Sequence, residues 1–212
     1  MKILLTAFEP FDGATINPAQ EALHLVPERI GDAEIARMEV PVVFGESVRV
    51  VAEAVDRLRP DAVLCIGQAG GRAALTMERV AINVDDASIP DNAGNQPIDA
   101  PVVPGAPAAY FATLPIKAIT ARIREAGVPA AVSNSAGTFV CNHLMYGVLH
   151  YLAEHHPRVR GGFMHVPFAP AQTLARPAPS MSVTDIARGI EAAARAIADT
   201  AEDVPVAEGA TC

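Results

Sequence analysis

The apolar run at 62–67, Ala-Val-Leu-Cys-Ile-Gly, does most to restrict the possible folds of this chain. A strand that is apolar at every position must be covered on both faces, which is typical of a parallel sheet between helices. Similar segments alternate with helical patterns along the sequence. We expect further strands at 3–8, 33–40, 130–132 and 162–166, and helices at 17–25, 45–58, 108–126, 138–152 and 183–198.

This alternation predicts an α/β fold, a single-domain three-layer sandwich whose mostly parallel sheet is flanked by helices. With 212 residues, half of them apolar, the chain can bury the core of one domain, which we place at 1–200. Residues 201–212 show no periodicity, so we expect a flexible tail. The proline-rich segment 90–107 is expected to be a long loop that forms a lid or a subunit contact, with disorder as the alternative.

Charge and cysteine content exclude several classes of protein. The formal net charge is −8 and no basic run occurs, so we expect no nucleic-acid partner. The apolar segment at 1–8 is too short for a signal peptide, and no stretch is long enough to span a membrane, so we expect a cytoplasmic protein with no membrane partner. The three cysteines, Cys65, Cys141 and Cys212, are widely spaced and are expected to be reduced thiols.

Residues 133–142 carry a strand through a turn of small residues into a helix. Gly137 permits the change of direction and Thr138 is the predicted N-cap, so Cys141 lies in the first helical turn. There the unpaired amides and the helix dipole favour the thiolate, which is the nucleophilic form of cysteine. Cys141 is therefore a candidate nucleophile. The alternative is a buried structural cysteine, the usual fate of a free thiol.

A thiol nucleophile needs a base, and His165 is the best placed of six histidines. It ends an apolar strand, at the edge where the active sites of open α/β sheets lie. His143 is only two residues from Cys141 and faces another side of the helix. One helix connects the strands 130–132 and 162–166, so we expect their carboxyl ends to lie side by side and bring Cys141 to His165. The other four histidines have ordinary structural or solvated explanations.

A third group must orient the imidazole, and Glu78 is the candidate. It lies within the otherwise apolar stretch 75–84, where an unpaired carboxylate would be costly. A structural ion pair with Arg72 or Arg79 is the alternative explanation. The glycine-rich turn at 67–72 matches neither the G-x-G-x-x-G spacing nor the P-loop spacing of phosphate-binding loops, so we expect no nucleotide site.

These three residues lie in blocks that resemble, in the same order, the signature blocks of the pyroglutamyl-peptidase I (pyrrolidone-carboxylate peptidase) family of cysteine peptidases. The blocks span residues 67–83, 133–142 and 163–167, and the segments 6–13, 17–18, 41–44 and 89–92 also resemble the family. The resemblance implies a phosphorylase/hydrolase-like α/β fold. It also implies removal of an N-terminal pyroglutamyl residue from peptides, with no metal and no cofactor.

The resemblance assigns a role to each residue. Cys141 attacks the carbonyl and forms a thioester, His165 moves the proton, and Glu78 holds the imidazole. Pyroglutamate is a small uncharged lactam, which needs an apolar slot with a few polar groups. The implied slot is lined by Phe8, Phe11, Ile89, Phe139 and Val140, with Asn17 and the main chain at Gln68 addressing the lactam. Core packing is the alternative for the aromatic residues.

Two further expectations follow from the resemblance. The protein should be a homo-oligomer, a dimer or tetramer, with the segment 90–107 as the candidate contact. Ser88 stands where the family usually has an arginine that assists the oxyanion; serine supplies one hydrogen bond and no charge. We expect either that Arg72 or Arg79 takes the place of the missing arginine, or that activity is lower than in the rest of the family. Two other functions therefore stay open: hydrolysis of another small cyclic amide, and binding of a lactam without catalysis.

Overall fold

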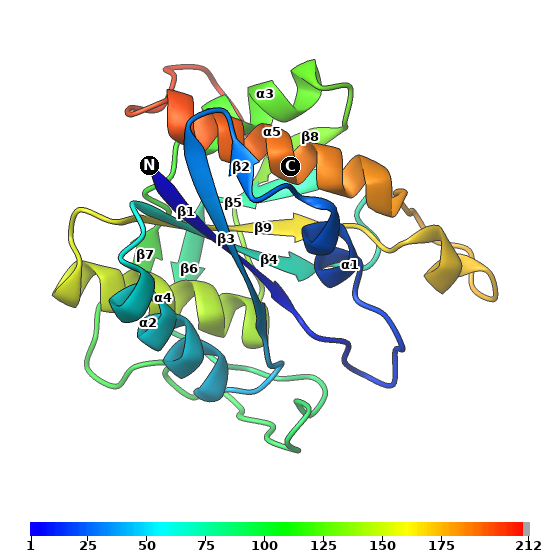
Figure 1. Cartoon of the computed structure of the whole chain (residues 1–212). Coiled ribbons are helices and arrows are strands. Elements are labelled where there is room, and N and C mark those ends of the chain that lie inside the picture. Colours follow the sequence, from blue (N-terminus) through cyan, green and yellow to red (C-terminus); the bar gives the residue numbers. More distant parts are fainter. Residues whose placement is uncertain (210–212) are drawn as a thin grey trace.

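Four parallel strands form the centre of the sheet in the computed structural model, which describes residues 1–209 (Figure 1). β1 (Lys2–Phe8) lies between β3 (Ala33–Val40) and β4 (Ala62–Gln68), and β9 (Arg160–Val166) pairs with the other side of β4. The predicted strands at these places are confirmed. Their apolar side chains are buried on both faces of the sheet, as the run at 62–67 indicates.

The remaining strands of the sheet include two antiparallel neighbours. β5 (Leu75–Glu78) runs antiparallel to β9, β8 (Ala130–Ser133) lies parallel to β5 at one edge, and the short β2 (Arg29–Ile30) pairs antiparallel with β3 at the other edge. The expectation that the strands around 130 and 162 are neighbours is therefore wrong. β5 separates them, and β8 runs opposite to β9.

A second, two-stranded sheet is formed by β6 (Val80–Ile82) and β7 (Ala109–Phe111). The prediction of a helix at 108–126 is wrong over its first part. Residues 109–111 form β7, and the helix α3 (Ile116–Glu125) begins only after Pro115. Proline at 115 supplies no amide hydrogen and is tolerated at a helix start but not in a helix interior. The helix therefore begins where Pro115 permits it.

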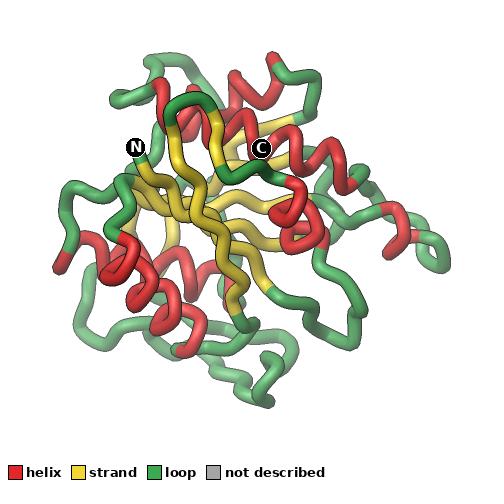
Figure 2. Tube along the Cα trace, viewed as in Figure 1, coloured by secondary structure: helices red, strands yellow, loops and turns green. Residues whose placement is uncertain are grey.

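Helices cover both faces of the large sheet and confirm the three-layer sandwich (Figures 1 and 2). One layer contains α1 (Pro18–Leu25), α3 and α5 (Val183–Asp199), and the other contains α2 (Glu46–Leu58) and α4 (Val140–His155). A short 3-10 helix, η1 (Pro170–Thr173), follows β9. Within residues 1–209, no helix combines the length and apolar character required to cross a membrane.

The long segment between β6 and β7 is held by side-chain hydrogen bonds to its own backbone. Asp91 accepts from the amides of Phe44, Ala93 and Asn95, and Asn83 exchanges hydrogen bonds with the backbone of Val103. Val102 and Val103 pack partly on the core beside α2 and α4, whereas the Ile98 side chain is exposed. Buried Asp91 thus links this segment to the residues that precede α2, and the expected role as a lid or contact stays a prediction.

The C-terminal residues 201–209 lie against α3 and the end of β5. Asp203 accepts hydrogen bonds from the Lys117 and Ala118 amides, 3.1 and 2.9 Å away, at the start of α3. Glu208 pairs with Arg124 at the other end of that helix. Residues 210–212, including Cys212, lie outside the described residues, and the flexibility expected for the tail stays a prediction.

Asp203 supplies the helix cap that Pro115, the N-cap residue of α3, lacks. Losing a capping carboxylate costs about 1 kcal/mol of folding free energy. We expect Asp203→Ala to lower the free energy of unfolding by that amount in urea denaturation, whereas Glu202→Ala, an exposed neighbour, should change it by less than about 0.5 kcal/mol. Equal effects of the two substitutions would contradict a capping role for Asp203.

Candidate active site

His165 and Glu78 lie on adjacent antiparallel strands and contact each other directly. His165 Nδ1 is 2.7 Å from Glu78 Oε1, and both side chains are buried on the face of the sheet that α4 covers. A carboxylate can only accept, so Nδ1 carries the proton and Nε2 is free to act as a base. The sequence analysis did not predict β5 as a strand, yet this strand is what delivers Glu78 to His165.

Cys141 is the second residue of α4, one position from the helix start. The N-cap is Phe139 rather than the predicted Thr138, whose hydroxyl instead donates to Asp86 O at 2.8 Å. The first intrahelical bond is donated by His143 N to Phe139 O, so the amides of residues 140–142 have no partner within the helix. These amides can stabilise a negative oxygen near the thiol.

The Cys141 sulfur lies against the backbone of β4, next to the strand that carries His165. Gly67 pairs with His165 in the β4–β9 register, and a Cβ at Gly67 would lie 3.0 Å from Cys141 Sγ and 2.8 Å from Phe163 Cζ. An added Cβ at this position would therefore force the buried Phe163 ring to shift and crowd the Cys141 thiol. The structure brings Cys141, His165 and Glu78 to one face of the sheet although β8 and β9 are not neighbours, because residues 134–139 lead the chain from β8 to this position.

Burial sets the resting protonation states of the thiol and the imidazole. Burial raises the pKa of Cys141 to about 12, the charge of Glu78 adds to the rise and Arg72 opposes it. Burial also lowers the pKa of His165, although the hydrogen bond to Glu78 acts in the opposite direction. Both shifts favour a neutral thiol and a neutral imidazole before substrate binds. Burial therefore acts against the thiolate that the helix start favours, and the thiolate stays a prediction.

Glu78 is ionised and held by Arg72. Burial raises the pKa of Glu78, but the hydrogen bond from His165, the nearby Ser133 hydroxyl and the charge of Arg72 outweigh it, so this pKa lies below its ordinary value. Arg72 Nη1 is 2.6 Å from Glu78 Oε1. Arg79 instead donates to Asn134 Oδ1 and Glu208 O. Of the two ion pairs that the sequence left open, the structure contains the one with Arg72, together with the contact to His165.

The aromatic residues expected in a substrate slot separate into two groups. Phe11 and Phe139 are half-buried, with ring centroids 6.3 Å apart, and Phe44 packs edge-on against Phe139 at 5.5 Å. Phe8 and Val140 are core residues, exposed by only 2% and 1%. The sequence analysis did not assign Phe44 to the slot, although the segment 41–44 was among those that resemble the family.

Two other expected slot residues, Asn17 and Ile89, have different surroundings. Asn17 is buried and caps α1: its Oδ1 accepts from Ala19 N and its Nδ2 donates to Glu9 O, both at 3.0 Å. Its amide therefore fixes the loop that follows β1. Ile89 is half-buried and follows Ser88, which is exposed. Neither residue lines the large cavity described next.

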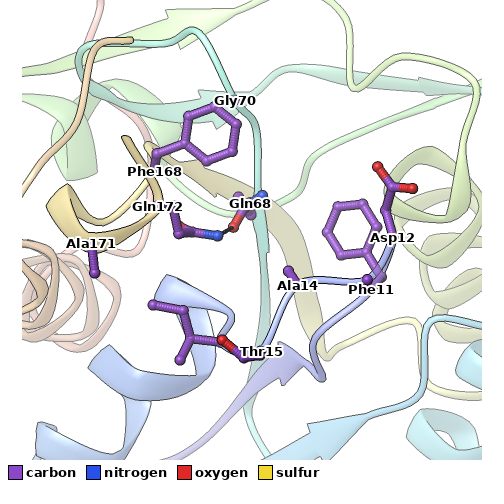
Figure 3. Close-up of a pocket in the computed structure, with 11 residues that line it drawn as sticks. Phe11, Asp12, Ala14, Thr15, Gln68, Gly70, Phe168, Ala171 and Gln172 are labelled. Carbon is purple, nitrogen blue, oxygen red and sulfur yellow. Dashed lines mark hydrogen bonds between the residues drawn. The ribbon is translucent and has the colours of Figure 1, made fainter. Parts of the chain in front are cut away.

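A cavity of about 660 Å³ opens beyond the carboxyl ends of β4 and β9 (Figure 3). Three loops line it with Phe11, Asp12, Gly13, Ala14, Thr15, Ile16, Gln68, Gly70, Phe168, Ala171 and Gln172. Gln172 Nε2 donates to Gln68 Oε1 at 2.8 Å, and Asp12 is the one charged side chain in this lining. Gln68 directly follows Gly67 in β4, but Cys141, His165 and Glu78 are not among the residues that line the cavity. Only Phe11 and Gln68 were expected from the sequence, because separate loops supply the rest.

Within residues 1–209, no three His, Cys, Asp or Glu side chains are grouped so that they could hold a metal ion. A second buried carboxylate–imidazole pair joins His143, two residues after Cys141 on α4, to Asp85 in the segment that follows β6. His143 Nδ1 contacts Asp85 Oδ2 at 2.8 Å and its Nε2 accepts from Gly45 N at 2.8 Å. Both ring nitrogens of His143 are occupied, so this histidine has a structural explanation.

Comparison with known proteins gives consistent matches over nearly the whole chain. The sequence model of the family described as pyroglutamyl peptidase matches residues 1–200. A pyrrolidone-carboxylate peptidase of Erwinia tasmaniensis is 55% identical over 99% of both chains, and one of Streptococcus pyogenes is 57% identical over 94% of this chain and 93% of its own. The crystal structure of pyroglutamyl peptidase I from Bacillus amyloliquefaciens has a TM-score of 0.95 and 47% identity, covering 97% of this chain and 99% of its own.

Proposed function

Because this chain belongs to the pyroglutamyl peptidase family, we propose that it removes N-terminal pyroglutamate from peptides through Cys141, His165 and Glu78. The observation that carries the assignment is the buried contact of 2.7 Å between His165 Nδ1 and Glu78 Oε1, on the face of the sheet where the Cys141 sulfur packs against Gly67. A nucleophile, a base and an orienting carboxylate are the three groups that acyl transfer requires.

The first half of the reaction forms a thioester. His165 Nε2 takes the proton from the Cys141 thiol as sulfur attacks the carbonyl that joins pyroglutamate to the next residue. The developing oxyanion accepts hydrogen bonds from free amides at the start of α4; removing one such donor typically costs about 2.7–4 kcal/mol of transition-state stabilisation. The C–N bond then breaks, and His165 returns the proton to the leaving amine.

The second half releases the acid. Water loses a proton to His165 Nε2 and attacks the thioester, and the C–S bond breaks as the thiol regains its proton. Glu78 holds Nδ1–H throughout, which keeps Nε2 directed at the reacting atoms. No step requires a metal or a cofactor.

The substrate ring and the rest of the peptide need different surroundings. We place the lactam against the half-buried rings of Phe11 and Phe139, beside the start of α4. The cavity of about 660 Å³ is larger than a single lactam ring needs, so it accommodates the residues that follow. A cytoplasmic location and a homo-oligomeric state, dimer or tetramer, belong to the same proposal.

The proposed function is tested with a pyroglutamyl amide of a fluorescent amine, compared with the prolyl amide of the same amine. Proline keeps the ring but replaces the lactam with a charged amine, which an apolar slot excludes. We expect kcat/KM to favour the pyroglutamyl amide by roughly 100-fold or more. Equal rates, or faster hydrolysis of another cyclic amide, would contradict it. Binding of pyroglutamate without release of the amine would indicate a lactam-binding protein instead.

A further inference from the structure

Arg72, in the turn between β4 and β5, touches the same carboxylate oxygen as His165. Its Nη1 lies 2.6 Å from Glu78 Oε1, and His165 Nδ1 lies 2.7 Å from that atom. Glu78 is fully buried, whereas the Arg72 side chain is 28% exposed. One oxygen thus accepts two hydrogen bonds, one from a permanent cation and one from the imidazole.

Further hydrogen bonds fix the Arg72 guanidinium. It donates to the Thr76 hydroxyl on β5, the residue that pairs with His165 across the sheet. Its Nη2 also lies 3.4 Å from Ser135 O, in the segment that leads to α4. Arg72 is therefore tied to the strand that carries Glu78 and to the loop that delivers Cys141.

Other neighbours do not replace this contact. Arg79 donates to Asn134 and Glu208. Ser133 on β8 pairs with Glu78 on β5, and its hydroxyl donates to Ser135 O at 3.1 Å, although it lies near enough to help lower the pKa of Glu78. Glu78 Oε2 has no hydrogen-bond partner among residues 1–209. A buried carboxylate held through a single oxygen depends strongly on the donors at that oxygen.

We propose that Arg72 is a positioning residue, which keeps Glu78 in the orientation that directs His165 toward Cys141. Its role in turnover rests on the proposed function. Its role in the Glu78–His165 hydrogen bond does not.

Arg72 also affects when His165 becomes protonated. The ionisable groups that act on the imidazole are Glu78 on β5 and Arg72 in the preceding turn, and the Cys141 thiol on α4 packs against Gly67, which pairs with His165. The positive charge of Arg72 lowers the pKa of His165. Because His165 acts as a base only when neutral, removal of this charge should make activity fall at a higher pH as the solution is acidified.

The activity test compares Arg72→Met and Arg72→Lys with Arg79→Met, a substitution of the adjacent arginine that does not touch Glu78. We expect Arg72→Met to lower kcat about 10- to 100-fold with KM nearly unchanged, since a hydrogen bond to a charged group is lost. The acid limb of the kcat/KM profile should move to higher pH, because the charge that lowers the pKa of His165 is removed. Arg72→Lys should return the acid limb to its wild-type position but recover only part of kcat. Lysine keeps the positive charge but lacks the planar guanidinium that donates to several acceptors at once.

A second measurement does not depend on turnover. The Nδ1 proton of His165, in a short bond to a carboxylate, should give a downfield proton NMR signal, identified by its absence in His165→Gln. Arg72→Met should shift or broaden that signal, whereas Arg79→Met should not. A wild-type acid limb together with an unchanged signal in folded Arg72→Met would overturn the proposal. If the wild-type protein released no pyroglutamate, the proposed function would fail, and the NMR comparison would still decide the role of Arg72.

Discussion

Replacing Cys141 with alanine should reduce kcat for a pyroglutamyl amide by about 10⁴-fold or more. Loss of a nucleophile removes the covalent route entirely, and enzymes that lose one retain only the rate given by binding and oxyanion stabilisation. Substrate binding should persist, because the aromatic rings and the cavity do not need the sulfur. The measurement is amine release at saturating substrate, with pyroglutamate binding followed separately by calorimetry.

Cys65→Ala is the matched control for this substitution. Cys65 is a buried cysteine on β4, and burial raises its pKa to about 12, as it does for Cys141. It is not part of the proposed mechanism, so its replacement should leave kcat within a few-fold of wild type while slightly lowering stability. Normal turnover by Cys141→Ala, or an equal loss in Cys65→Ala, would contradict the assignment of the nucleophile.

Replacing Glu78 with glutamine should lower kcat by roughly 10²- to 10⁴-fold, the second largest effect we expect. The amide can present N–H to His165, which would stabilise the tautomer with Nε2 protonated and remove the base. It also leaves the Arg72 guanidinium beside a neutral group in a site that burial makes sensitive to charge. KM should change little, because Glu78 does not contact the substrate in the proposed mechanism.

The chain offers a matched control for this second substitution as well. Asp85 and His143 form another buried carboxylate–imidazole contact, at 2.8 Å, on the same side of the sheet. Asp85→Asn should destabilise the fold by a similar mechanism but leave kcat within a few-fold of wild type. If Asp85→Asn reduced kcat as strongly as Glu78→Gln, the loss would reflect damage to the fold rather than loss of the orienting carboxylate.

Most of the fold is predictable from local pattern. Continuous apolar segments such as 62–67 indicate strands that are covered on both sides, and the helices around Val51 and Ile190 have clear apolar faces. β5 was missed because it is only four residues long, although Leu75 and Met77 alternate with Thr76 and Glu78 as in a half-buried strand. The polar side chains of this alternation contact Arg72 and His165, so the site residues themselves carry the strand signal.

The order of the strands was harder to predict than their existence. A single helix between two strands favours parallel neighbours, but the antiparallel strand β5 occupies the place between β8 and β9. No local signal in residues 75–78 indicates that direction. The candidate residues Cys141, His165 and Glu78 were found by chemistry and resemblance, whereas the cavity lining came from loops that only the fold places together.

The central claim is that Cys141 carries the acyl group, and trapping that intermediate tests it most directly. The enzyme would be mixed with an activated pyroglutamyl ester, for which deacylation limits turnover, quenched in acid within the burst and examined by mass spectrometry. We predict one pyroglutamyl group per active chain, located on the peptide that contains Cys141 and absent from Cys141→Ala. Full turnover with the adduct on a different residue, or with an adduct that persists in Cys141→Ala, would contradict the account.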